Sequence, residues 1–334
     1  MKITLVIPPS PFLIDDRVFP FLGPLQIGAL ARQLGHEVVV ADLTGYKRRH
    51  PDKKHVTFDE VLEEAKVRLV EMARGSDVVG FYSLAAQHPG VMKLKETLSD
   101  AYPGCATVLG GPHANTSPNR CIADGFDYVV VSDQGGGGGE AGFLEVLSRL
   151  TNKSSLKRKV SLIDPNSDRI IKVPSRKGVK WENDEWPLPA RDLIDLKDYI
   201  YHIEGERATS IVSATGCPFA CTYCSHWGGY RKLEAKSSEY VRQEIREIKR
   251  NYGMRAIMFY DDEINLRPDF SDEFLTMLKE EDVIWRAFFK NGKNLTNEAV
   301  FKSMAESGCV QLCTGAESAN PKILKDIRKG ASLE

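Results

Sequence analysis

Three of the seven cysteines, Cys217, Cys221 and Cys224, form the densest group of metal-binding side chains in the chain, with the spacing Cys-x3-Cys-x2-Cys. The apolar residues 210–213 just before them predict a strand, so the cysteines are expected on the loop that leaves it. Three thiolates this close bind either three corners of an iron–sulfur cluster or a structural zinc ion, which needs a fourth ligand such as His226. We favour the cluster. The odd number of cysteines argues against a disulfide framework.

Charged residues follow the predicted strands downstream of these cysteines. The strand predicted over 256–260 ends at Asp261, Asp262 and Glu263, and acids at that position indicate a solvent cleft or ligand site rather than a core. An exposed acidic loop is the alternative. Further strands are predicted over 284–289, ending at Lys290, and over 310–313. We interpret two more cysteines as small buried apolar residues, namely Cys309 and Cys313.

The first half of the chain alternates strands with helices. Together they predict an α/β fold, an open five-stranded parallel sheet with helices on both faces. Strands are predicted over 3–7, 38–41, 78–82, 107–109 and 128–131, and helices over 25–34, 58–73, 90–102 and 141–150.

Ligands of such sheets bind at the carboxyl ends of the strands. There the chain places Ser83, Gly110 and Gly111, and the glycines let a flat or phosphate-bearing ligand approach the backbone. Sharp turns are the plainer interpretation of these glycines. The five glycines at 135–139 are either a loop over a ligand or a linker, and their composition favours a linker.

Length and charge bound the remaining possibilities. The 334 residues predict a domain at 1–150, a linker with a possible small hairpin at 151–206, and a second domain at 207–334. A net charge of −1 gives no argument for nucleic acid or an anionic membrane as partner. The sequence contains no apolar stretch of about 20 residues, so we expect no membrane span and a cytoplasmic protein with a small-molecule substrate. Neither the dinucleotide fingerprint nor the phosphate-binding P-loop occurs.

The stretch Gly-Cys-Pro-Phe-Ala-Cys-Thr-Tyr-Cys at 216–224 resembles the hallmark loop of the radical S-adenosylmethionine (SAM) superfamily. The resemblance implies a 4Fe–4S cluster held by Cys217, Cys221 and Cys224, whose fourth iron stays open to the amino and carboxylate groups of SAM. It also implies an electron donor such as flavodoxin or ferredoxin. Electron transfer into the sulfonium then yields a 5′-deoxyadenosyl radical that abstracts hydrogen.

The same resemblance implies further contacts to SAM. Tyr223 stands where family members often carry an aromatic residue beside the adenine, although simple packing is its alternative. Asp261 and Asp262 fall at the end of the second barrel strand, which contacts SAM in the family. Glu317, in the Gly-Ala-Glu-Ser stretch at 315–318, resembles the strand-four glutamate that helps to hold SAM.

The chain as a whole resembles the radical SAM class that carries a cobalamin-binding domain. That class includes many methyltransferases and the anaerobic magnesium-protoporphyrin ester cyclase. The resemblance implies cobalamin as a cofactor, with Ser83, Gly110 and Gly111 among its contacts, and it favours methyl transfer to an unactivated carbon or phosphorus centre. A radical cyclase or rearrangement enzyme is the second hypothesis, and a non-catalytic cluster- or cobalamin-binding protein is the third. The stretches that carry the resemblance are 20–25, 35–38, 109–113 and 187–191.

Two departures from the class bear on the cofactor. The sequence lacks Asp-x-His-x-x-Gly, the motif whose histidine ligates cobalt from below in many methyltransferases. Where relatives often carry Gly-Glu-Gly-Glu, this chain has Gln134, five glycines and Glu140, so that loop is expected to bind cobalamin differently or not at all.

The second domain is short for its family. Residues 207–334 suffice for about four strand–helix units, whereas radical SAM barrels usually have six. An incomplete barrel leaves an unpaired sheet edge. We therefore expect a fragment, half of a split enzyme, or a form completed by a partner chain.

Overall fold

The computed structural model describes residues 1–13, 15–132, 138–151, 163–164, 167–173, 186–224, 233–292 and 297–331. The chain divides into two compact units. The first comprises Met1–Asp133, Gly137–Ser175 and Pro187–Tyr199, and the second is built chiefly from Ile200–Glu334. In the described part of the chain, no helix is both long and apolar enough to cross a membrane.

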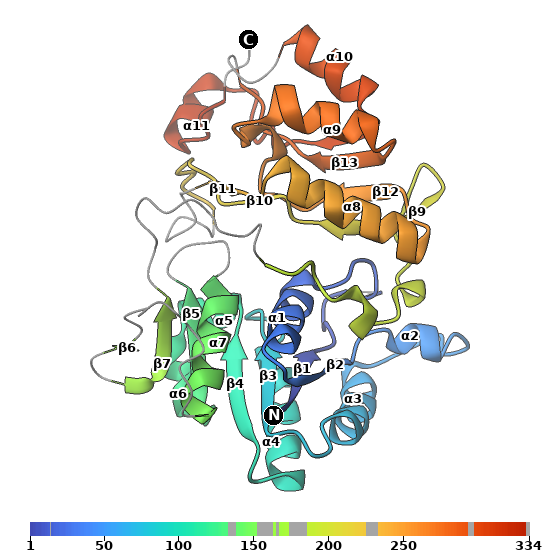
Figure 1. Cartoon of the computed structure of the whole chain (residues 1–334). Coiled ribbons are helices and arrows are strands. Elements are labelled where there is room, and N and C mark those ends of the chain that lie inside the picture. The colour runs from blue at the N-terminus through green and yellow to red at the C-terminus, as the bar shows by residue number, and fades with distance from the viewer. Residues whose placement is uncertain are drawn as a thin grey trace. The chain divides into compact units, whose positions relative to one another are not determined.

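A seven-stranded sheet forms the centre of the first unit, in the order β2-β1-β3-β4-β5-β7-β6 (Figure 1). The first six of these strands run parallel, and only β6 is antiparallel to its neighbour. All five predicted strands are present. The sixth parallel strand, β7, comes from the segment in which the sequence predicted a small hairpin. The bounds are β1 Lys2–Ile7, β2 Glu37–Asp42, β3 Val78–Tyr82, β4 Ala106–Gly110, β5 Tyr128–Ser132, β6 Ile163–Asp164 and β7 Ser167–Val173.

Helices cover both faces of this sheet because its strands are apolar on both sides. On one face, Leu5, Val108 and Val130 point towards the α1 and α7 side. On the other, Val6, Leu109 and their neighbours form a core with α3, α4 and α6. The helices are α1 Leu22–Gln33, α2 Tyr46–Arg49, α3 Phe58–Met72, α4 His88–Ala101, α5 Pro112–Thr116, α6 Pro118–Ala123 and α7 Gly138–Thr151.

The proline-rich segment after Trp186 belongs to the first unit. It runs along α1, where the amide of Ala190 donates to the carbonyl of Leu25 and Gln26 Nε2 donates to the carbonyl of Pro187. Two 3-10 turns follow it, η2 Arg191–Leu193 and η3 Leu196–Asp198.

The second unit has a five-stranded sheet in the order β14-β13-β12-β9-β8. Four of its strands run parallel and are each followed by a helical segment, whereas the short β8 is antiparallel to β9. This arrangement confirms the predicted partial barrel. The short strands β10 and β11 pair with each other and flank the cysteine loop. The strands are β8 His202–Ile203, β9 Glu206–Ile211, β10 Ala214–Thr215, β11 Glu234–Ala235, β12 Ala256–Phe259, β13 Ile284–Phe288 and β14 Cys309–Cys313. The helical segments are α8 Ser238–Tyr252, η5 Ile264–Leu266, η6 Phe270–Phe274, α9 Leu275–Glu280, α10 Glu298–Glu306 and α11 Pro321–Asp326.

Candidate functional site

The cysteine loop is attached to the barrel by two acids at the end of β12. The carboxylate of Asp261 accepts hydrogen bonds from the amide of Ser213, at 2.6 Å, and from its hydroxyl. The amide of Gly216 donates to Asp262 Oδ2 at 3.0 Å. Gly216 has a φ of +91°, a conformation that favours glycine, and it directs the chain into the first cysteine. The two acids thus fix where the loop begins.

Asp261 and Asp262 differ in what they can offer a ligand. Asp261 is 2% exposed, and burial raises the pKa of its carboxyl. Its two oxygens are both used by Ser213, whose carbonyl accepts from the buried Arg267 at 2.8 Å. These are the contacts of a residue that positions the loop. Asp262 is half-buried, and its Oδ2 accepts from the Gly216 amide; being less buried than Asp261, it is the better placed of the two to face a ligand.

The three cysteines on this loop are half-buried and form no disulfide. Burial raises the pKa of Cys217, and the charges of Glu263 and Asp262 raise it further. The amide of Cys224 donates to the carbonyl of Cys221 at 3.1 Å, which closes a tight turn between these two cysteines. The alternative zinc ligand, His226, lies outside the described residues.

The segment after α11 packs against the same loop. The amide of Thr222 donates to the carbonyl of Ile327 at 3.0 Å, and Cys221 Sγ lies 4.0 Å from the carbonyl oxygen of Lys329. At Gly330, where φ is +65°, an added Cβ would come within 2.9 Å of the Phe219 ring. The end of the fourth strand–helix unit is therefore part of the site.

Two lysines, neither of them a predicted site residue, stand beside the thiols. Lys290, at the end of β13, is 2% exposed; its Nζ donates to the carbonyl of Lys329 at 2.6 Å and lies 4.6 Å from the centre of the Phe219 ring. Burial lowers the pKa of Lys290, and the nearby Lys329 lowers it further. The one sequence signal for Lys290 as a site residue was its position at the end of a predicted strand. A cation buried at the carboxyl end of a barrel strand needs an anionic partner.

Tyr223, Glu317 and Lys329 meet although about a hundred residues separate the first from the other two. Lys329 Nζ lies 3.2 Å from Glu317 Oε1, and hydrogen bonds from Tyr223 and then Lys329 lower the pKa of Glu317. Glu317 has a φ of +59°, an unusual conformation for a residue with a side chain. The Tyr223 ring is 53% exposed, so its face is available to a planar ligand.

This donor set fits a cluster with three cysteine ligands. Three thiols on one loop supply three thiolates, and Lys290 and Lys329 lie close enough to offset their negative charge, since Cys221 Sγ and Lys290 Nζ both approach the Lys329 carbonyl. The remaining two cysteines of this unit do not join them. Cys309 is half-buried, with its pKa raised by burial to about 12, and Cys313 Sγ accepts from Arg286 Nη2 at 3.3 Å.

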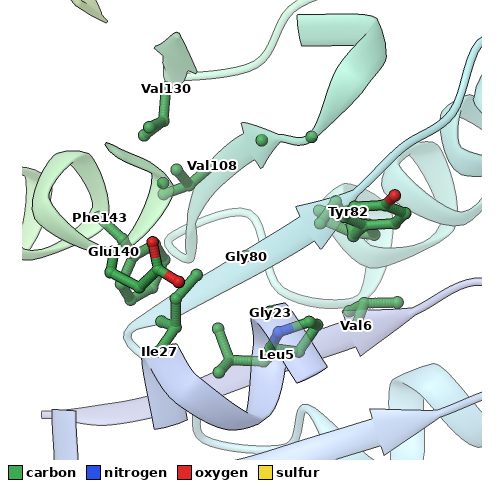
Figure 2. A pocket seen from close by; sticks show the side chains of 15 residues that line it. Leu5, Val6, Gly23, Ile27, Gly80, Tyr82, Val108, Val130, Glu140 and Phe143 are labelled. Atoms are coloured by element: carbon green, nitrogen blue, oxygen red, sulfur yellow. The ribbon is translucent and has the colours of Figure 1, made fainter. Parts of the chain in front are cut away.

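In the first unit, an apolar pocket of about 170 Å³ opens between α1, α7 and the sheet (Figure 2). We call it the glycine slot, because glycines from four elements line it. An added Cβ at Gly23, Gly110 or Gly139 would meet no atom within 4 Å. The pocket is therefore open because these residues have no side chain. Glu140 is the one charged residue among its described lining residues, which are Leu5, Val6, Gly23, Pro24, Ile27, Gly80, Phe81, Tyr82, Val108, Gly110, Gly111, Val130, Gly139, Glu140 and Phe143.

Of the three ligand contacts predicted in this unit, two line the slot and one does not. Gly110 and Gly111 line the slot, whereas the fully buried Ser83 does not. The Ser83 hydroxyl donates to the carbonyl of Leu84, and its own carbonyl accepts from the amide of His113. An added Cβ at Gly111 would come within 3.0 Å of this Ser83 carbonyl. Ser83 therefore supports the turn that carries Gly111.

The glycine slot fits part of a large cofactor with an apolar, flat group, since its walls are apolar and its floor is bare backbone. Sequence reasoning missed most of its lining. Of the unusual loop that follows β5, only Gly138, Gly139 and Glu140 lie within the described residues, and the last two line the slot.

Comparison with known proteins assigns both units. The family model of the radical SAM superfamily matches residues 211–334, and that of the B12 binding domain matches residues 18–137. The first match contains the cysteine loop, and the second contains Gly110 and Gly111 of the glycine slot.

Relatives align along nearly the whole chain. An uncharacterized methyltransferase of Pyrococcus horikoshii is 28% identical over 99% of this chain and 68% of its own length. The cytidylyl-2-hydroxyethylphosphonate methyltransferase of Streptomyces wedmorensis is 26% identical over 94% of this chain and 64% of its own. The chain thus spans about two thirds of the length of these relatives.

A solved structure shares the fold. The radical SAM methyltransferase TsrM of Kitasatospora setae, solved with cobalamin and a 4Fe–4S cluster, superposes with a TM-score of 0.70 at 16% identity, over 100% of this chain and 62% of TsrM. With both domain models matched in this order, the chain carries a B12-binding domain followed by a domain of the radical SAM superfamily.

Proposed function

We propose that this chain is the cofactor-binding part of a cobalamin-dependent radical SAM methyltransferase. The observation that carries the proposal is the meeting of three thiols with a set of charged side chains at the carboxyl edge of the partial barrel. That set comprises Asp262, Glu263, Lys290, Glu317 and Lys329. A site built only for structural zinc has no use for two buried lysines, because thiolates and zinc already balance much of each other's charge.

In this proposal each residue of the site has a distinct task. Cys217, Cys221 and Cys224 hold the cluster, and Lys290 and Lys329 stabilise its negative charge. Asp262 and Glu317 contact the SAM amino group, and Tyr223 offers its exposed face to the adenine. When bound, the cluster supplies the electron that cleaves SAM, and cobalamin carries the methyl group.

The glycine slot would hold an apolar part of cobalamin. Gly110 and Gly111 let the cofactor approach the backbone, and Phe143 and Ile27 give it apolar walls. Glu140 is placed to accept a hydrogen bond from an amide of the cofactor. Asp261 and Ser83 act behind these contacts, by holding the cysteine loop and the Gly111 turn in place.

The proposal extends to partners and compartment. The electron would come from a protein such as flavodoxin or ferredoxin, in a reducing and anaerobic cytoplasm that keeps the thiols free. Among the described residues, β14 pairs on one side only, and Val310 on this strand is 44% exposed. A further segment or a partner chain would cover this edge and complete the substrate pocket. We propose a small molecule, methylated at an unactivated carbon or phosphorus, as the substrate.

Mass spectrometry of the SAM-derived products tests this function. The chain is reconstituted anaerobically with iron and sulfide and supplied with reductant, cobalamin and SAM, with Cys221→Ala as the control. We expect both 5′-deoxyadenosine and S-adenosylhomocysteine from the wild type and neither from the variant. Deoxyadenosine alone would replace the methyltransferase by a radical cyclase or rearrangement enzyme. The absence of both, despite an assembled cluster, would contradict an independent catalytic function.

A further inference from the structure

A second group of metal-binding side chains lies in the first unit, away from the glycine slot. His88 at the start of α4, His113 on the short helix α5 that follows β4, and Cys121 on α6 bring one ligand atom each within 4.8 Å of one another. The two imidazole rings lie 4.0 Å apart between centres and are inclined by 35°. Cys121 belongs to the core on the α3 and α4 face of the sheet, opposite the face that carries the slot. The proposed function uses none of the three.

Two nitrogen atoms of this group are buried without a hydrogen-bond partner. They are Nδ1 of His88 and Nε2 of His113. Buried polar atoms of native proteins are nearly always paired, so an unpaired couple in one place points to a missing ligand. Beside them, the thiol of Cys121 is fully buried. Two imidazole nitrogens and a sulfur are the donor types that zinc prefers.

A carboxylate at the other nitrogen of His88, Nε2, orients the ring so that Nδ1 can bind a metal. His88 Nε2 lies 3.0 Å from Asp124 Oδ2, and Asp124 Oδ1 lies 2.9 Å from Arg120 Nε. With the carboxylate ionised, Nε2 carries the proton and donates it, which leaves the Nδ1 lone pair free for a metal. A carboxylate behind a metal-binding histidine is a common arrangement, because it fixes the tautomer and the ring orientation.

We propose that His88, His113 and Cys121 bind a single Zn²⁺ ion, with water in the fourth position and Asp124 orienting His88. The ion would fasten the start of α4, α5 and α6 to one another. The turn that leads into α5 begins at Gly110 and Gly111, which line the glycine slot from the other side. This zinc site is independent of the cysteine loop and of the proposed methyl transfer.

Cobalt substitution tests the site in the full chain. Because the cysteine loop can also bind the probe, the background carries Cys217→Ala, Cys221→Ala and Cys224→Ala together. Titration with Co²⁺ should give the visible bands of a tetrahedral site and a thiolate charge-transfer band, saturating at one equivalent. Cys121→Ser should abolish the charge-transfer band, whereas Cys105→Ser, the matched change at the other cysteine of this unit, should leave it intact.

Two further variants separate metal binding from folding. His113→Gln alters a half-buried side chain, so the unit should fold while Co²⁺ affinity falls at least ten-fold. Asp124→Asn should keep the bands and weaken affinity about 10- to 100-fold, the usual effect of changing a partner behind a ligand. A further comparison uses the reconstituted chain with its cysteine loop intact. There, Cys121→Ser should contain less zinc than the wild type and the same amount of iron. The proposal is overturned if Co²⁺ gives no tetrahedral bands, or if those bands survive both Cys121→Ser and His113→Gln.

Discussion

The two units of this chain hold their ligands by opposite means. The site of the second unit is made of thiols and charged side chains, and these chemical groups themselves bind the ligand. The glycine slot of the first unit is made of absent side chains, and its only charged described lining residue is Glu140. A substitution should therefore damage the first kind of site by removing a group and the second kind by adding one.

The largest effect is expected from removing a thiol. Cys221→Ala should abolish the cluster and with it all cleavage of SAM, because a ligand that binds iron has no substitute in alanine. Iron content, absorption and product formation measure this loss. Cys309→Ala is the matched control, since that half-buried thiol lies on β14 and hydrogen-bonds the nearby Gln311 carbonyl; it should retain the cluster.

The next effect comes from filling the glycine slot. Gly110→Val should weaken cobalamin binding by about 100-fold, or ~2.7 kcal/mol, because the added methyl groups occupy the space that the cofactor needs. The fold should hold, since an added Cβ there meets no atom within 4 Å. Equilibrium dialysis against cobalamin measures the change. Gly104→Val also meets no nearby atom but lies outside the slot, and equal losses in both variants would show that the slot is not the cofactor site.

A smaller effect is expected where a carboxylate positions the cysteine loop. Asp261→Asn keeps an acceptor for the Ser213 amide but puts an NH2 donor where the Ser213 hydroxyl now finds an acceptor, so the hydroxyl proton loses its partner. The loss should destabilise the second unit by about 1–3 kcal/mol. Chemical unfolding measures it, with the exposed Asp282→Asn as control. A change no larger than that of the control would argue against this positioning role.

The helix caps offer a nearly matched pair across the two units. Thr57 caps α3 by accepting from the Glu60 amide, and Ser237 caps α8 by accepting from the Tyr240 amide. Replacing either by alanine should cost about 1 kcal/mol. If the units unfold separately, calorimetry should show each variant shifting one transition and not the other. A shift of both transitions would mean that the units unfold together.

The smallest effect concerns pH. The backbone amide of Thr57 holds the pKa of Glu60 below its ordinary value, so the ionised carboxylate stabilises the folded state. That contribution is complete above the ordinary pKa of a glutamate and disappears as the pH falls through the lowered one. The difference in melting temperature between wild type and Glu60→Gln should therefore close on acidification. A difference that persists in acid would contradict the capping role of this side chain.

Much of the fold could be predicted because its signals are local. The runs of Val and Ile at 38–41, 78–82 and 128–131 indicate buried strands, and β1 to β5 follow them closely. The strand β7 was only partly predicted: its residues Ile170 and Ile171 indicated a hairpin, which β6 and β7 do form, but nothing local showed that β7 also pairs with β5 and extends the sheet. Asp261 and Asp262 were predicted as equals, yet burial makes one a support for the loop and leaves the other half-buried near the thiols.

By itself, the sequence determined the cysteine spacing, the alternation of strands and helices and the glycines at Gly110 and Gly111, because each depends on residues close together in the chain. Only the tertiary structure decided that Lys290 and Lys329 stand beside the thiols, that Glu317 meets Tyr223, and that two histidines and Cys121 share one point in the core. The reason is physical. Parallel strands bring their carboxyl ends to one edge after crossovers of many residues, so the side chains that meet there leave no common pattern in the sequence.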